Sequence, residues 1–193
     1  MKHPTPPATP ASAGSPLLLD RVLPEADFRS RYTRRVRAEP AAVWDALTTL
    51  AAEDLPVSRR LMALRSAGRT RLSGPLVETF PTPTLLRDEG TELVKGKIAK
   101  FWRVRPETAP VEPGDPAAFT AFEDPGWAKV AMSLRVAPDG PGSLLAFETR
   151  VRGTDAFARR VFGPYWLLIR AGGAGFIRLE ILGAAARRAE RAS

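Results

Sequence analysis

The change of periodicity near residue 153 is the feature that most constrains this fold. Over residues 144–151 apolar and polar residues alternate, which is typical of a strand with one buried face. After Thr154 and Asp155 the apolar residues recur at helical spacing almost to the C-terminus. A last strand followed by a long C-terminal helix predicts a sheet that packs against that helix, an arrangement that typically encloses an apolar pocket.

The predicted C-terminal helix has an apolar stripe that is rich in aromatic residues. Asp155 is expected to cap its N-terminus, where a carboxylate also suits the helix dipole. Gly172 and Gly173 predict a kink or an interruption, because paired glycines are costly inside a helix. The stripe consists of Phe157, Val161, Phe162, Tyr165, Trp166 and Ile169, followed by Ile177, Ile181, Ala184 and Ala185.

A series of strands is predicted before this helix, with two short helices after the first strand. The first helix starts at Pro40, since proline suits the first helical position, and the second spans about residues 55–67. Residues 69–83 and 106–116 contain several prolines and read as loops, and residues 138–142 as a hairpin turn. Besides residues 144–151, the predicted strands are residues 32–38, 84–87, 92–104, 119–123 and 127–137.

The chain has 193 residues, enough for one domain of ordinary size. Prolines recur among Ala, Thr and Ser near the N-terminus, a composition with little to bury, which predicts a disordered tail over residues 1–26. Residues 27–193 are then expected to form a single domain. No secretory signal and no apolar run suited to a membrane span is apparent, which favours a cytoplasmic protein.

Two absences exclude several kinds of chemistry. There is no cysteine, which rules out disulfides, thiolate metal sites and a cysteine nucleophile. The only histidine, His3, lies in the predicted tail, so neither a Ser-His-Asp triad nor a histidine metal site is expected inside the fold. No phosphate-cradling glycine loop joins a strand to a helix. We therefore expect no metal and no cofactor.

The chain is strongly basic, with a formal charge of +8 and a pI near 10.7. Arginines supply nearly all of this charge and are spread over several segments, which favours a solvated surface. The alternative is an affinity for nucleic acid or for anionic lipid head groups. We rank nucleic acid low, because no aromatic stacking platform lies among the basic residues.

Several segments resemble the SRPBCC superfamily, which includes START-type lipid-transfer domains, plant-allergen-like proteins and polyketide cyclase/dehydrase-type proteins. The segments with the most specific match resemble a bacterial branch of it. The resembling segments begin with residues 36–44 (VRAEPAAVW), 94–102 (VKGKIAKFW) and 122–129 (FEDPGWAK). The most specific part is residues 148–151 (ETRV) and 154–155 (TD), then Phe162, Tyr165 and Trp166.

The resemblance implies an α+β helix-grip fold, in which a curved antiparallel sheet wraps around a long C-terminal helix. It also implies a cavity between sheet and helix for a hydrophobic or amphipathic small molecule. It does not imply catalysis, since the superfamily includes carriers and receptors as well as some enzymes.

If this cavity exists, the inward-facing residues of the strands and the helix stripe should line it. The alternative for each of them is a place in an ordinary core. The candidate ligand-binding residues are Ile98, Trp102, Val130, Met132, Phe147, Thr149, Tyr165, Trp166 and Ile169.

Glu148 and Arg150 share one face of the last strand, but the alternation does not fix which face that is. On an outer surface they would form ion pairs across strands with Arg35 or Arg37. On the inner face, where a buried charge must be paired, they would orient the polar end of a ligand. A cyclase-like enzyme would need Glu148, Arg150 or Tyr165 for proton transfer.

Ligand binding without demonstrable catalysis is therefore the preferred hypothesis. The alternatives are a polyketide cyclase/dehydratase-like enzyme and a basic module that attaches to nucleic acid or an anionic membrane.

Overall fold

The structure of the protein is a computed structural model that describes residues 17–55, 74–79, 82–171 and 174–192. Its centre is an antiparallel sheet in the strand order β1-β6-β5-β3-β2, with the short β4 paired to β3. The strands are β1 (Phe28–Val36), β2 (Thr84–Asp88), β3 (Glu92–Lys100), β4 (Glu107–Thr108), β5 (Ala128–Asp139) and β6 (Gly142–Gly153).

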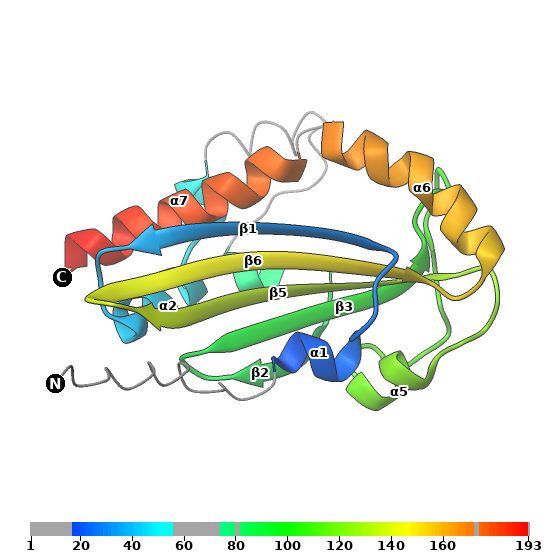
Figure 1. Ribbon diagram of the computed structural model, residues 1–193, viewed down its shortest axis with the longest axis horizontal. Coiled ribbons are helices and arrows are strands. Elements are labelled where there is room, and N and C mark those ends of the chain that lie inside the picture. Colours follow the sequence, from blue (N-terminus) through cyan, green and yellow to red (C-terminus); the bar gives the residue numbers. More distant parts are fainter. Residues whose placement is uncertain (1–16, 56–73, 80–81, 172–173, 193) are drawn as a thin grey trace, which may run out of the picture.

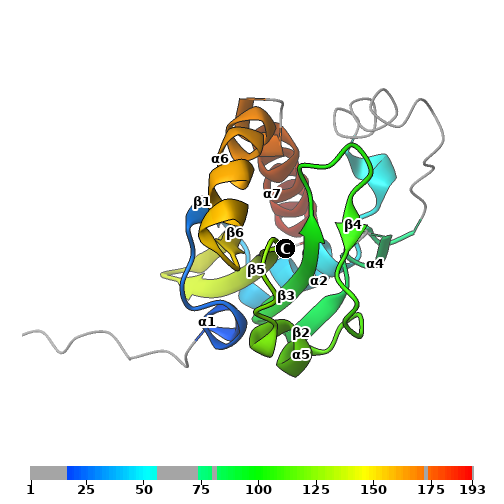
Figure 2. The same ribbon diagram turned by 90° about the vertical axis from the view of Figure 1, so that its right-hand side faces the viewer.

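Helices cover both faces of the sheet. Figures 1 and 2 show α6 and α7 on one side and α1 with α5 on the other. The helices are α1 (Leu18–Val22), α2 (Pro40–Thr48), α4 (Leu76–Thr79), α5 (Pro116–Ala121), α6 (Ala156–Ala171) and α7 (Ala174–Ala192), with a 3-10 turn at Ala52–Asp54. The antiparallel sheet with C-terminal helices packed on it confirms the predicted α+β helix-grip architecture. The second short helix expected after β1 lies largely outside the described residues.

We call the face covered by α2, α6 and α7 the inner face. Its main apolar cluster joins Leu47 of α2, Phe147 of β6 and Ile181 of α7. A second cluster joins Val151 of β6 to Phe162 and Trp166 of α6. The inner face therefore has one cluster under each C-terminal helix.

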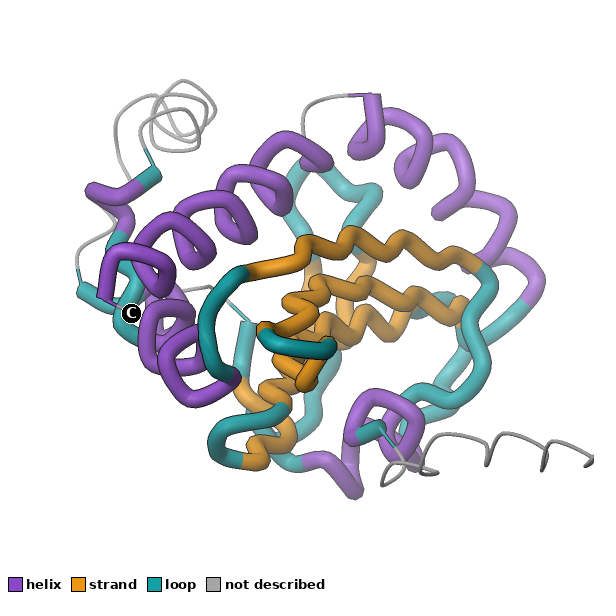
Figure 3. Tube along the Cα trace, turned by 60° about the vertical axis from the view of Figure 1, so that its left-hand side comes forward, coloured by secondary structure: helices purple, strands orange, loops and turns teal. Residues whose placement is uncertain are grey.

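Two helices form the C-terminal part of the chain, and the paired glycines predicted to interrupt it lie between them, outside the described residues. Helix α6 ends at Ala171 and α7 begins at Ala174, and Figure 3 shows two separate helices that lie along the sheet. The expected cap is also present, since the Ala158 backbone N–H donates to Asp155 Oδ1 at 2.6 Å. None of the helices within the described ranges is long and apolar enough to span a bilayer.

The outer face is covered by α1 and α5, and here two predictions are wrong. Residues 17–26 are not part of a disordered tail, because Leu19, Val22 and Leu23 are buried against the sheet. Residues 119–121, expected to start a strand, end α5 instead. Asp115 caps that helix by accepting from the N–H groups of Ala117 and Ala118, and proline occupies its first position.

The boundaries of the strands differ less from the predictions. The first strand begins at Phe28 instead of residue 32, and β3 ends at Lys100 instead of residue 104. Part of the expected loop at residues 69–83 is the short helix α4. The predicted hairpin between β5 and β6 is present, with Gly140 at a φ of 61° in the turn, a conformation that glycine adopts without strain.

Candidate functional site

A row of three polar side chains and one methionine crosses the inner face between its two apolar clusters. Strand pairing places Ser30 of β1 opposite Thr149 of β6, Thr149 opposite Met132 of β5, and Met132 opposite Lys95 of β3. We call these four residues the transverse row. In β1 the row separates Phe28 from Tyr32, and in β6 it separates Val151 from Phe147, so it interrupts a largely apolar surface.

Three polar atoms at or near this row are buried without a partner. Ser30 Oγ and Thr149 Oγ1 form no hydrogen bond within the described part of the chain, and neither does Nε of Arg178 from α7. The Arg178 guanidinium lies 5.5 Å from the centre of the Phe147 ring. Burial lowers its pKa, although Tyr32 opposes this effect. Buried polar atoms in native proteins are nearly always paired, so a water molecule or another polar group is expected beside these three.

Lys95 ends the transverse row and is bonded. Its Nζ donates to the carbonyl of Val77 at 2.5 Å and to Thr84 Oγ1 at 3.3 Å. Burial lowers the pKa of this amine, while the charge of Glu78 acts in the opposite direction. A desolvated ammonium gains from a further anionic or acceptor group within reach.

Lys95 also separates two hollows of different size. The inner one is apolar and holds about 20 Å³, room for about one water molecule. Its walls are Leu47, Leu76, Val77, Leu93, Lys95, Met132, Leu134, Phe147 and Ile181.

The other hollow is a cleft of about 450 Å³ at the edge of the sheet, between β2 and β4. Lys95, Lys97, Ile98, Phe119 and Asp115 are among the residues that line it. Gly96 lies at its base, where an added Cβ would lie 2.3 Å from Leu85 Cδ1. Any larger residue there would push Leu85 aside.

An aromatic group closes the α6 end of the inner face. The Phe162 ring lies 5.4 Å from Tyr165, 5.4 Å from Phe28 and 6.4 Å from Trp102, measured between ring centres. Trp166 also packs against Phe28, at 6.0 Å. Such tilted and edge-to-face pairs stabilise a rigid wall at this end.

Most of the predicted cavity residues lie on the inner face. Val130, Met132, Phe147 and Thr149 point toward the helices from β5 and β6, and Tyr165 and Trp166 face them from α6. Trp102 follows the end of β3 and joins the aromatic group, and Ile169 is half-buried on α6. Whether these residues contact a ligand stays a prediction.

The placement of Ile98 on the inner face is wrong. It packs with Leu19 and Phe119 on the outer face and lines the edge cleft. β3 is buried on both faces over most of its length, so apolar residues occupy both sets of alternating positions and the inner set cannot be identified from the pattern.

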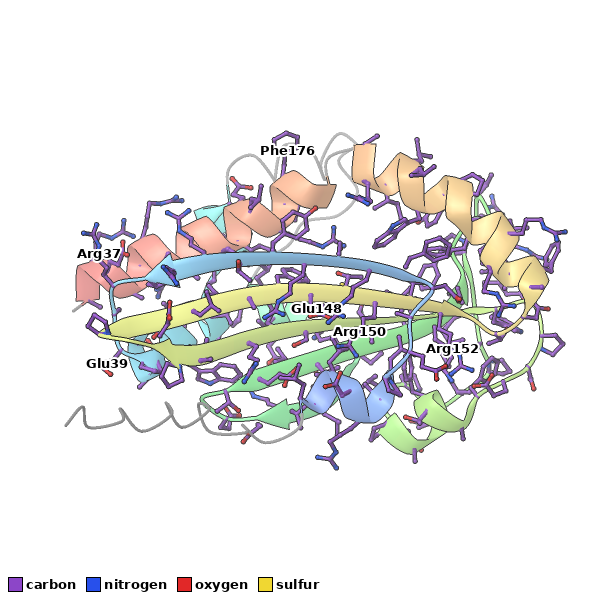
Figure 4. The ribbon with its side chains drawn as sticks, viewed as in Figure 1. Arg37, Glu39, Glu148, Arg150, Arg152 and Phe176 are labelled. Carbon is purple, nitrogen blue, oxygen red and sulfur yellow. The ribbon has the colours of Figure 1, made fainter. Side chains whose placement is uncertain are left out.

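Glu148 and Arg150 lie on the outer face, beneath α1, as Figure 4 shows. Arg150 Nε donates to Glu148 Oε1 at 2.7 Å, and its Nη1 donates to Asp20 Oδ1 at 2.6 Å and to the Leu23 carbonyl at 2.9 Å. Burial lowers the pKa of Arg150, but the hydrogen bonds to Glu148 and Asp20 outweigh it and raise the pKa.

The ion-pair interpretation of Glu148 is thus right in kind but names the wrong partners. Arg29 binds Glu148 at 2.6 Å and Arg31 lies at 3.9 Å, whereas Arg35 pairs with Asp139. The pair is also buried beneath α1 instead of lying on a solvated surface. The interpretation in which Glu148 and Arg150 hold a ligand in the inner cavity is therefore wrong.

Sequence analysis missed Ser30, Lys95 and Arg178. Ser30 alternates with Phe28 and Tyr32 on β1, so a strand assignment that began at residue 28 would have identified it as an inward polar residue. Successive side chains of a strand alternate between its faces, so the prediction that Ile98 points inward places Lys95 on the outer face. Arg178 is one residue beyond the helix stripe at Ile177, and no local pattern marks it as buried.

Comparison with known proteins finds only weak structural similarity. No protein-family model matches the sequence, and no curated protein is similar to it. Protein MLL2253 from Mesorhizobium loti is similar in structure, at 13% identity over 86% of this chain and 99% of that one, with a TM-score of 0.38.

A protein from Thermus thermophilus, TTHA0849, is 12% identical over 86% of this chain and 99% of that one, with a TM-score of 0.34. The Zhui aromatase/cyclase from a Streptomyces species is 14% identical over 86% and 98%, with a TM-score of 0.32. All three similarities are weak in both sequence and structure. At these TM-scores they carry no information on activity, and the helix-grip assignment rests on the chain's own strand order and helix packing.

Proposed function

We propose that the protein binds a hydrophobic or amphipathic small molecule or lipid between the sheet and its C-terminal helices. The observation that carries this proposal is the transverse row, where Ser30 and Thr149 place buried hydroxyls without partners in the middle of an apolar face. The polar end of a ligand supplies the missing hydrogen bonds, and the two apolar clusters receive its hydrocarbon part.

Binding requires the inner face to open. The inner void of about 20 Å³ admits no small molecule larger than water, so α6, α7 or α4 must move away from the sheet. Lys95 borders both this void and the edge cleft, so an anionic or acceptor group in that cleft can reach its amine.

The test combines two measurements. Native mass spectrometry of the protein purified from cells should show a co-purifying small molecule that is lost on denaturation. After this molecule is removed, anilinonaphthalene sulfonate, an amphipathic anion, should bind with enhanced fluorescence. Ser30→Ala and Thr149→Val should each weaken this binding by about fivefold, the value of one hydrogen bond.

Ser133→Ala is the matched control, because Ser133 is a buried serine of the same sheet on the outer face, where it donates to Glu92 at 2.6 Å. It should lower stability and leave probe binding unchanged. Equal probe affinity in wild type, Ser30→Ala and Thr149→Val, together with no co-purifying molecule, would contradict the proposal.

The cyclase-like alternative loses its best acid. Glu148 lies on the outer face, and no inward-facing position of β1, β3, β5 or β6 carries Asp or Glu. Tyr165 remains, but it packs against Phe162 and has no carboxylate on these strands to exchange protons with. The geometry therefore favours binding over carboxylate acid–base catalysis.

A further inference from the structure

Large apolar side chains are exposed on the side of α6 and α7 that faces away from the sheet. The exposed fractions are 59% for Phe157, 67% for Leu167 and 68% for Leu168 on α6, and 72% for Phe176 on α7. Figure 4 shows Phe176 pointing away from the sheet beside the junction of the two helices. Soluble proteins rarely expose several large apolar residues on one surface unless something binds there.

Helical spacing places the α6 residues on one continuous stripe. Phe157, Leu167 and Leu168 share a face of α6 with Arg160. The positions at helical spacing on this face are 157, 160, 164, 167, 168 and 171. Leu179, half exposed, follows Phe176 by three positions on α7. We call Phe157, Arg160, Leu167, Leu168, Phe176 and Leu179 the roof surface.

The roof surface is basic as well as apolar. α6 has arginines at positions 159, 160 and 170 and no acidic residue. Arg160 and Arg170 are exposed, and neither pairs with an acid within the described residues, while Arg159 reaches Asp27 only at 3.9 Å. A helix with one apolar face and unpaired arginines is typical of segments that lie in the interface of an anionic bilayer.

A second copy of the chain fits this surface less well. In a twofold dimer the same patch meets itself, so the unpaired arginines of one copy would approach those of the other. Anionic lipid head groups supply the opposite charge, and the acyl region receives the leucines and phenylalanines. Nucleic acid would pair with the arginines but leave the apolar side chains exposed to water.

We propose that the roof surface docks the protein on anionic lipid bilayers, with α6 lying along the membrane surface. The docking needs no ligand on the inner face, so it stands or fails independently of the proposed ligand binding. The roof surface is the solvent-facing side of α6 and α7, and the opposite side of these two helices covers the inner face.

The experiment is flotation of the full chain with vesicles of phosphatidylcholine alone, and with phosphatidylcholine mixed with phosphatidylserine. The protein should float with the mixed vesicles at low salt, and the bound fraction should fall as salt screens the arginines. Leu167→Ser/Leu168→Ser should weaken partitioning about tenfold or more, because two apolar side chains no longer enter the acyl region.

Arg160→Gln/Arg170→Gln should weaken it roughly 30-fold, which corresponds to about 1 kcal/mol for each arginine near an anionic surface. Two control variants match these changes outside α6 and α7. Val104→Ser alters a fully exposed apolar residue in the turn after β3, and Arg105→Gln removes a neighbouring exposed charge. Both should float as the wild type does.

Three results would overturn the proposal. The first is no flotation with either kind of vesicle, and the second is equal flotation of the wild type and Leu167→Ser/Leu168→Ser. The third is concentration-dependent dimerisation in sedimentation analysis that the leucine variant abolishes while vesicle binding is absent. That last result would assign the roof surface to a second copy of the chain.

Discussion

The two faces of the sheet hold their polar groups in opposite ways. On the outer face Glu92, Lys129, Glu148 and Arg150 are buried, and each has at least two polar partners. On the inner face the polar residues are fewer, yet Ser30 and Thr149 have no partner within the described ranges. The buried charges of the outer face are thus all paired, whereas two buried hydroxyls of the inner face lack a hydrogen-bond partner within the described ranges.

Under the proposed function, unpaired buried atoms mark the binding site and buried charges do not. The alternation along β6 singles out Glu148 and Arg150, the buried charges under α1, as candidates for a site. Their hydrogen bonds, however, hold α1 on the sheet. The Leu18 N–H donates to Glu92 Oε2 at 2.9 Å, which ties the start of α1 to β3. The outer face is therefore expected to contribute to stability, and the inner face to binding.

The largest expected effect is that of Arg150→Met, which removes the central cation of the outer face. Glu148 would keep Arg29, but the guanidinium bonds to Asp20 and the Leu23 carbonyl would be lost. We expect the free energy of unfolding in urea to fall by about 4 kcal/mol, as when one partner of a buried ion pair is removed.

Arg152→Met is the matched control for this variant. Arg152 lies two residues further along β6, is partly exposed and reaches Glu25 only at 3.9 Å; Figure 4 shows it beside Arg150. Its loss should cost less than about 1 kcal/mol. Similar costs for the two variants would mean that the outer network does not stabilise the fold.

The next largest effect is expected for Leu19→Ala, which tests whether α1 belongs to the folded unit. Leu19 is 1% exposed against the outer face, so truncation should cost about 3 kcal/mol of unfolding free energy, from lost transfer energy and a residual cavity. Leu18→Ala, at a half-buried position of the same helix, should cost clearly less. If neither variant changes the urea concentration at the midpoint of unfolding, α1 does not stabilise the fold.

The same comparison explains which features the sequence alone could predict. Local patterns were sufficient for β5 and β6, where one face is apolar, and for the helical character of the chain after Asp155. They failed for Arg150, because its partner Asp20 lies 130 residues away and short patterns carry no information on such contacts. α1 was missed because three consecutive leucines in a proline-rich stretch are too short a signal.

Two further misses have physical reasons. In β3 both faces are buried, so periodicity could not separate Lys95 from Ile98. Residues 119–123 have strand-like composition, but Asp115 and Pro116 before them form a strong helix start, so residues 119–121 belong to α5. The unpaired hydroxyls at the transverse row could not be foreseen at all, because lack of a partner is a property of the assembled fold.

A smaller effect concerns pH and Lys129, the buried amine of the outer face. Burial lowers its pKa, with a hydrogen bond to Glu123 opposing the change. In the unfolded chain the pKa returns to about 10.5, so at pH values between the two the unfolded state binds more protons and stability rises with pH. Charging Lys129 therefore costs stability at neutral pH.

The measurement is the free energy of unfolding from neutral pH toward pH 10, for wild type and Lys129→Met. The wild type should gain stability relative to the variant as the pH rises, even though the variant loses the bonds from Nζ to the Thr120 and Phe122 carbonyls at every pH. Parallel pH profiles would show that Lys129 does not titrate differently in the folded protein.

The smallest expected effect has the opposite sign and belongs to the inner face. Thr149→Val replaces a buried hydroxyl without a partner by a methyl group of similar size, which removes a desolvated polar atom and loses no hydrogen bond. We expect ligand-free protein to become more stable by about 0.5–1 kcal/mol in urea unfolding, whereas polar-to-apolar changes on the outer face destabilise it. The same substitution should lower the stability gained on adding anilinonaphthalene sulfonate, because the ligand then lacks its hydrogen-bond partner. A loss of stability in the ligand-free protein would mean that Thr149 is already bonded, and the contrast between the two faces would disappear.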